Sequence, residues 1–274
     1  MLTETFRSII SAARKVFTNW RAMFLLATVY ASLLVALYFF VAVREASIVQ
    51  VILTFALAIV TPLLFFVLQS MVASQTDGVT AGSLLKRSLT SFWKLILISL
   101  PLIALAVLIA YLLAKAQSHV GASLNETADL PHQIVTRAGA QPPARPINWK
   151  IALLSTVRYL AFGLVLPLAA IHLWLATVHE GLGTAVRRAG THLARAFAPQ
   201  SVLIYIAGFV VFGVIPYFLL FKATPTNHAW LEVSLLVARL VAVFALTLFG
   251  WVITVRALGQ SSSNPALNRA NEAT

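Results

Sequence analysis

The chain has 274 residues, of which 60% are hydrophobic and only 10% are charged. Soluble domains carry about 25% charged residues, so this composition excludes a water-soluble globular protein and predicts a membrane protein. A net charge of +12 would suggest nucleic-acid binding in a soluble chain. Here the basic residues mostly flank apolar runs, which favours contact with anionic lipid head groups and predicts no nucleic-acid partner. The chain has no cysteine, which excludes disulfides and thiolate chemistry.

Six apolar runs are long enough to cross a bilayer as helices, which takes about 20 residues each. We therefore predict an all-α polytopic fold with six transmembrane helices: Ala22–Val43, Ser47–Ser70, Leu95–Ala114, Ile151–Val178, Ser201–Phe221 and Leu231–Val255. The first run is longer than the apolar core of a signal peptide, about 7–15 residues, and no small-x-small cleavage site follows it. We interpret it as a retained span.

Three basic amphipathic segments precede successive pairs of spans. They read FRSIISAARKVFTNWRAMFLL from Phe6, AGSLLKRSLTSFWKLILI from Ala81, and LGTAVRRAGTHLARAFAPQSVLI from Leu182. Apolar residues recur in each at helical spacing, which in the first gives Phe6, Ile10, Ala13, Phe17 and Trp20. We predict three interfacial helices whose basic faces contact lipid phosphates, through Arg14, Lys15, Trp20, Arg21, Lys86, Arg87, Trp93, Lys94, Arg187, Arg188 and Arg195.

The distribution of Lys and Arg predicts the orientation of the chain. With the N-terminus inside, 12 basic residues fall in inner segments and 6 in outer segments, so both termini are expected in the cytoplasm. Segment 115–150 is then a long extracytoplasmic loop, and 257–274 is expected to be a disordered cytoplasmic tail.

The connecting segments also indicate a repeat within one membrane domain, residues 1–256. Each of three tandem units, 1–74, 75–178 and 179–256, would hold an interfacial helix and a helical hairpin. The ends of two spans echo each other, as WLATVHEG and WVITVRALG. A chance similarity is the alternative, because many membrane proteins alternate basic, aromatic and apolar segments.

The connectors DGVTAGSLLKRSL and EGLGTAVRRAG resemble those of the six-span membrane domain found ahead of some bacterial glycerophosphodiester phosphodiesterases and of its stand-alone relatives. The resemblance covers nearly the whole chain. It implies a six-span fold in a bacterial cytoplasmic membrane, and it implies no catalytic residue, because no phosphodiesterase domain follows the last span.

The sequence holds few groups that could carry out catalysis. No acidic residue lies in the middle of a span, and the chain has no HExxH, no GxSxG and no glycine-rich phosphate loop. His172 and His179 are seven residues apart on one helix face, with Glu180 beside them. The ordinary explanation of such a pair is hydrogen bonding to a neighbouring helix. We therefore predict no enzyme, no cofactor and no metal site.

Two arginines, Arg158 and Arg239, lie within apolar runs, each about eight residues from the predicted outer end of its span. The first interpretation is that their guanidinium groups reach the outer head groups. The second is an internal partner, such as Glu232 for Arg239 or a backbone carbonyl near a proline. The third is that the two arginines converge on one site for an anion or a phosphate-bearing lipid.

The leading functional hypothesis is a non-enzymatic membrane protein that binds anionic phospholipid. One alternative is a transporter of a small anionic solute or lipid, with Arg158 and Arg239 along its path and with prolines breaking four spans. Another is a membrane scaffold subunit for a protein that the sequence does not identify.

Overall fold

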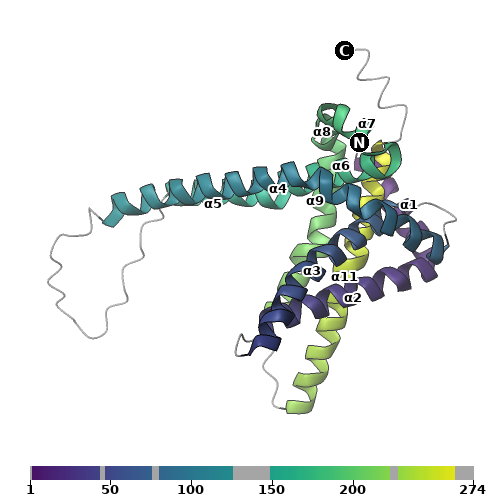
Figure 1. The fold of residues 1–274 in the computed structure, drawn as a ribbon, viewed down its shortest axis with the longest axis horizontal. Coiled ribbons are helices and arrows are strands. Elements are labelled where there is room, and N and C mark those ends of the chain that lie inside the picture. Colours follow the sequence, from purple (N-terminus) through teal and green to yellow (C-terminus); the bar gives the residue numbers. More distant parts are fainter. Residues whose placement is uncertain (1, 44–46, 76–79, 126–148, 223–227, 263–274) are drawn as a thin grey trace. The chain divides into compact units, whose positions relative to one another are not determined.

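The computed structural model describes residues 2–43, 47–75, 80–125, 149–222 and 228–262, and every element in these ranges is a helix (Figure 1). The chain divides into two compact units. The first contains residues 1–99 and 168–274, and the second contains residues 100–167.

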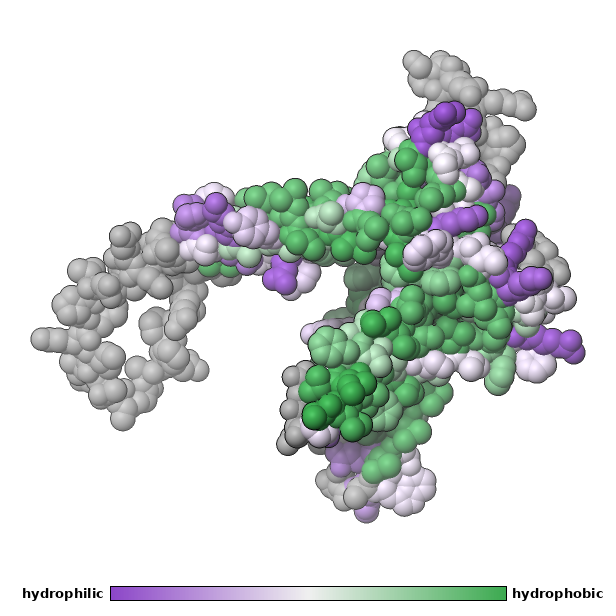
Figure 2. All heavy atoms as spheres, in the orientation of Figure 1, coloured by the Kyte–Doolittle hydropathy of each residue, from purple (hydrophilic) through white to green (hydrophobic). Residues whose placement is uncertain are grey.

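Six helices in the described ranges are long and apolar enough to cross a membrane: Trp20–Ala42, Ile48–Ala73, Ala81–His119, Trp149–Glu180, Pro199–Phe221 and Trp230–Ser261. Each of them contains all or nearly all of one of the six runs predicted from the sequence, and the third and the sixth extend well beyond their runs. Much of their exposed surface is apolar (Figure 2), which suits contact with lipid and not with water. The chain is therefore a multi-pass α-helical membrane protein.

The first connector forms its own helix. Helix α1 (Leu2–Thr18) ends before Asn19, whose side chain accepts a hydrogen bond from the amide of Ala22 (3.4 Å) and caps α2 (Trp20–Ala42). Asparagine is a favoured cap because its side chain satisfies an amide that the first helical turn leaves without a partner. Helix α3 (Ile48–Ala73) then packs against α2.

The other two connectors differ from the single interfacial helices that the sequence predicts. The second is the N-terminal part of one continuous helix, α4 (Ala81–Asn125), because no capping or breaking residue separates it from the span that follows. The third forms two short helices, α7 (Leu182–Arg187) and α8 (Ala189–Ala196). It begins at Gly181, whose φ of 86° is a conformation that favours glycine.

The first unit is held together by packed helices with a few polar contacts between them. Helix α6 (Leu166–Glu180) is the most buried, and its Trp174 indole donates a hydrogen bond to Ser99 Oγ (2.8 Å). Helix α11 (Ala229–Ser262) contributes Trp251, whose indole donates to Gln69 Oε1 of α3 (2.9 Å). Such bonds between helices help to fix their register in a lipid-facing bundle.

Small residues bring α9 (Pro199–Phe209) close to α11. A Cβ atom at Gly208 would overlap the side chain of Thr254, and one at Gly250 would lie 2.9 Å from Cβ of Phe212. Glycine at both positions therefore allows the backbones to approach, as is common between transmembrane helices.

Four prolines lie inside the spans, away from their first residues, and two of these follow a π-helical segment. The segment η1 (Ala161–Val165) lies between α5 (Trp149–Leu160) and Pro167, and η2 (Val210–Val214) leads into α10 (Ile215–Phe221), which contains Pro216. The wider π-helical turn before a proline leaves space for its ring. It also suits a residue that has no N–H to donate to the preceding turn. The other two prolines, Pro62 and Pro101, lie inside uninterrupted α-helices.

The structure corrects two predicted boundaries. Part of the predicted loop 115–150 is helical, because α4 continues to Asn125; residues 126–148 lie outside the described residues. The predicted disordered tail begins too early, because α11 continues to Ser262. Ala257 and Leu258 are fully buried, so packing keeps this part helical. Residues 263–274 lie outside the described residues.

Candidate functional site

Helix α1 carries a shallow groove on its exposed surface, with a volume of about 550 Å³. Basic, hydroxyl and apolar side chains line it: Thr3, Phe6, Arg7, Ile10, Ser11, Arg14 and Lys15. These residues recur every three or four positions, so they form one stripe along the helix. The groove combines positive charge with two large apolar side chains.

The opposite side of α1 is buried. Thr5, Ala12 and Val16 are buried, and α1 packs against α11 and α9. Phe6 and Ile10, by contrast, are 63% and 65% exposed. The apolar stripe predicted from the sequence therefore faces outward, beside the basic residues. An exposed apolar stripe bordered by Lys and Arg is typical of a helix that lies in the head-group region of a membrane.

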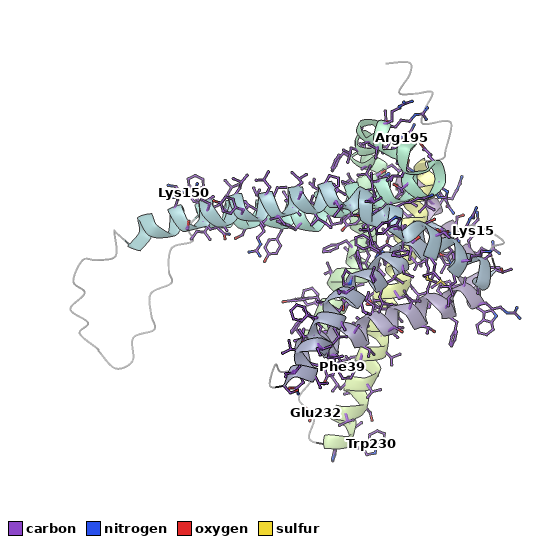
Figure 3. All side chains as sticks on the ribbon, in the orientation of Figure 1. Lys15, Phe39, Lys150, Arg195, Trp230 and Glu232 are labelled. Carbon is purple, nitrogen blue, oxygen red and sulfur yellow. The ribbon has the colours of Figure 1, made fainter. Side chains whose placement is uncertain are left out.

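The groove combines basic side chains with apolar ones. Guanidinium groups bind phosphate oxygens in a bidentate geometry and ammonium groups bind them as point charges, which gives Arg7, Arg14 and Lys15 a common role. The side chain of Lys15 projects away from the ribbon in Figure 3. Phe6 and Ile10 form the apolar part of the groove. Sequence reasoning missed Arg7, Thr3 and Ser11, although their spacing from Arg14 indicated the shared stripe.

The remaining predicted interface residues are also exposed, but they lie outside this groove. They are Trp20, Arg21, Lys86, Arg87, Trp93, Lys94, Arg187, Arg188 and Arg195. Those on the second connector, Lys86, Arg87, Trp93 and Lys94, lie on the exposed side of the helix. Its other side is buried at Leu84, Ser88 and Leu95. This connector therefore has an amphipathic pattern within the helix that continues into the span. Of the predicted residues, the structure brings only Arg14 and Lys15 into the α1 groove.

The two arginines within the spans belong to different units. Arg239 lies on α11 in the first unit, and its Nη1 donates a hydrogen bond to the backbone carbonyl of Lys222 (2.6 Å) at the end of α10. This carbonyl is one of those that a helix end leaves without an intrahelical partner. Glu232, also on α11, is labelled in Figure 3. Arg158 is exposed in the last turn of α5, in the second unit. Their convergence on one site stays a prediction.

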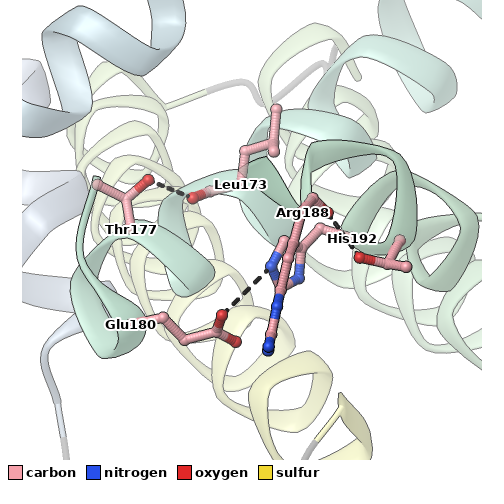
Figure 4. A network of polar contacts seen from close by, with 6 residues as sticks. Leu173, Thr177, Glu180, Arg188 and His192 are labelled. Carbon is pink, nitrogen blue, oxygen red and sulfur yellow. Dashed lines mark hydrogen bonds and ion pairs between the residues drawn. The ribbon is translucent and has the colours of Figure 1, made fainter. Parts of the chain in front are cut away.

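A second polar cavity lies at the end of α6. It has a volume of about 280 Å³ and is lined by His172, Leu175, Ala176, His179, Glu180, His192, Arg195 and Gly259. Figure 4 shows how α8 brings His192 toward Glu180, with His192 Nε2 and Glu180 Oε2 3.6 Å apart. Hydrogen bonds within each helix flank this pair, from Thr177 to the Leu173 carbonyl (2.7 Å) and from Thr191 to the Arg188 carbonyl (2.7 Å).

The cavity extends the histidine pair noted in the sequence. His172 and His179 both line it, as expected for residues two turns apart, but His192 and Arg195 join them from another helix. Among the residues that the structure describes, no three His, Cys, Asp or Glu side chains are grouped as metal ligands would be.

Comparison of the chain with protein-family models, with curated proteins and with solved structures found no match. The resemblance to the membrane domain associated with glycerophosphodiester phosphodiesterases stays a prediction from the connector sequences.

Proposed function

We propose that this multi-pass protein is a non-enzymatic component of a bacterial cytoplasmic membrane and binds anionic phospholipid at its cytoplasmic face. The principal contact is the groove on α1, and the basic residues of the other connectors add to it. Both termini lie in the cytoplasm, as the distribution of Lys and Arg predicts. No cofactor takes part.

One observation carries this proposal: α1 exposes Phe6 and Ile10 in the same groove as Arg7, Arg14 and Lys15. A helix that only packed against the bundle would bury its large apolar residues, and a helix that only faced water would not expose two of them side by side. Lipid satisfies both parts of the groove, since acyl chains cover the apolar residues and phosphate pairs with the bases.

The proposal predicts a preference for anionic over zwitterionic phospholipid that depends on α1. Each Lys or Arg near an anionic surface contributes about 1 kcal/mol, so the three bases together contribute about 3 kcal/mol. Replacing Arg7, Arg14 and Lys15 by Gln should then weaken binding of phosphatidylglycerol about 150-fold at low salt. The measurement is a titration of the full chain, purified in neutral detergent, with phosphatidylglycerol or phosphatidylcholine in mixed micelles, followed by tryptophan fluorescence.

A matched control removes the same charge from the predicted outer segments. The variant with Lys115, Lys150 and Lys222 replaced by Gln should keep the preference for phosphatidylglycerol within about threefold. Equal losses in the two variants would show that only net charge matters, and an unchanged preference in the α1 variant would refute the groove as the lipid contact.

A further inference from the structure

The polar cavity at the end of α6 lies within the first unit and is separate from the α1 groove. Its walls come from the C-terminal half of α6, from α8 and from the C-terminal end of α11. A Cβ atom at Gly259 would lie 3.6 Å from Leu175, so α11 closes one side of the cavity. These three helices hold the lining residues without any contribution from the second unit.

Two nearly buried imidazoles line the cavity, and the Nε2 atom of each has no hydrogen-bond partner in the described part of the chain. His172 and His192 are only 4% and 6% exposed. The distance of 3.6 Å from His192 Nε2 to Glu180 Oε2 is too long for a hydrogen bond. Buried polar atoms are nearly always paired in proteins. His192 Nε2 has only its ion pair with Glu180, and His172 Nε2 has no hydrogen-bond partner among the described residues, so His172 in particular indicates a group that the protein chain does not itself supply.

The cavity also holds opposite charges that do not pair with each other. Arg195 follows His192 by three residues on α8, so both lie on one face of that helix. In the described part of the chain, the structure shows an ion pair between Glu180 and His192 and none between Glu180 and Arg195. An anion without a positive charge would be attracted by Arg195 and repelled by Glu180. A cation without a negative charge would be attracted by Glu180 and repelled by Arg195. A molecule with both charges is attracted at both ends.

The size and position of the cavity restrict the molecule further. A volume of about 280 Å³ lies just below the range of roughly 300–1,000 Å³ typical of sites for drug-sized ligands, so the occupant is small. His172 precedes Glu180 by eight residues, or roughly 12 Å along the helix. Glu180 is the last residue of the helix Trp149–Glu180, which is long and apolar enough to cross a membrane, so the cavity lies at one end of that helix.

We propose that this cavity binds a small zwitterion in which a phosphate is joined to an ammonium group, as in free phosphoethanolamine or the head group of an ethanolamine phospholipid. Arg195 binds the phosphate, and the Nε2 atoms of His172 and His192 donate hydrogen bonds to its oxygens. Glu180 accepts hydrogen bonds from the ammonium group. This site goes beyond the proposed binding of anionic phospholipid, because it uses different residues and selects a different head group.

The test is isothermal titration calorimetry on the full chain in neutral detergent, with O-phosphoethanolamine as the probe. Glycerol 3-phosphate, ethanolamine and serine serve as partial or alternative ligands. We expect saturable binding of phosphoethanolamine at least tenfold tighter than that of each of the other three. Nanodiscs with or without phosphatidylethanolamine separate the two sources: if the lipid is the occupant, its presence abolishes the heat of binding of the free compound, and if the free compound is the occupant, its binding is unchanged.

Three variants assign the charges. Arg195→Gln should weaken the binding of phosphoethanolamine at least tenfold. Glu180→Gln should lower the affinity for phosphoethanolamine to that for glycerol 3-phosphate. The affinity for glycerol 3-phosphate itself should not fall. Arg187→Gln is the matched control, because Arg187 is exposed on the same connector and does not line the cavity. All three positions are exposed, and circular dichroism checks that each variant keeps its helix content.

Several results would overturn the proposal. These are the absence of saturable binding in both nanodisc preparations, equal affinities for phosphoethanolamine and glycerol 3-phosphate, or binding of serine as tight as that of phosphoethanolamine. An equal loss in Arg187→Gln and Arg195→Gln would also refute it. None of these results bears on the α1 groove, whose variant is tested with phosphatidylglycerol, so the two proposals fail independently.

Discussion

Replacing Gly208 by Ala should destabilise the protein even though alanine is the better helix former. The added Cβ atom would overlap Thr254 Oγ1 and would lie 2.7 Å from its Cγ2 and 2.9 Å from its Cβ. The side chain of Thr254 is 3% exposed, and its hydroxyl donates a hydrogen bond to the Gly250 carbonyl (2.6 Å). It therefore cannot rotate away without leaving a buried hydroxyl unpaired, so α9 and α11 must move apart.

The magnitude follows from two opposing effects. Overpacking a buried contact costs about 1–3 kcal/mol, and the change from Gly to Ala within a helix recovers up to about 1 kcal/mol. The net loss is up to about 2 kcal/mol, which lowers the melting temperature by up to about 8 °C for a chain of this size. Intrinsic tryptophan fluorescence reports the transition, because Trp251 lies on α11, the helix that Gly208 packs against.

Gly190→Ala is the matched control. Gly190 lies on α8, and no atom comes within 4 Å of an added Cβ, so this change should leave the melting temperature unchanged or raise it by up to about 4 °C. In a Thr254→Ala background, Gly208→Ala should cost about 1 kcal/mol less than in the wild type. An equal response of the two glycines, or a cost that is unaffected by Thr254→Ala, would refute the close contact between α9 and α11.

Two further predictions concern polar contacts between helices. The hydrogen bond from Trp251 to Gln69 (2.9 Å) should give a coupling of about 0.6 kcal/mol, and at most about 1.7, in a double-mutant cycle of Trp251→Phe and Gln69→Leu measured by thermal unfolding; additive effects would contradict the bond. Arg239→Met should cost about 1 kcal/mol because the carbonyl of Lys222 loses its partner. Arg239→Lys should restore part of that loss, and a melting temperature unchanged in both variants would show that the contact is not stabilising.

The spans could be predicted from the sequence because their signal is length, which needs no knowledge of tertiary contacts. The stripe of Phe6 and Ile10 on α1 could also be predicted, because its signal is the helical spacing of apolar residues, which is local. The buried side of α1 was not predictable, since Thr5, Ala12 and Val16 are small or weakly apolar and give no clear periodic pattern. The second connector is continuous with its span in α4, which the sequence does not indicate, because a change in polarity along the chain need not end a helix.

The histidine cavity shows a different limit. His172 and His179 could be placed on one face from their spacing, but His192 joins them only because the chain turns at Gly181 and brings α8 back over the end of α6. No periodic pattern in the sequence predicts such a contact between two separate helices. Likewise, an internal partner is one of three interpretations of Arg239 that the sequence allows, and the carbonyl of Lys222 is its partner because α10 packs on α11.

The most direct test of the account is native mass spectrometry of the full chain, loaded with equal amounts of phosphatidylglycerol and phosphatidylcholine in a mild detergent. The wild type is compared with the variant in which Arg7, Arg14 and Lys15 are replaced by Gln, and with Arg158→Ala/Arg239→Ala. The account predicts that the wild type and the double variant retain phosphatidylglycerol in preference to phosphatidylcholine, and that the α1 variant loses this preference. Equal retention of both lipids by the wild type, or an unchanged preference in the α1 variant, would contradict it.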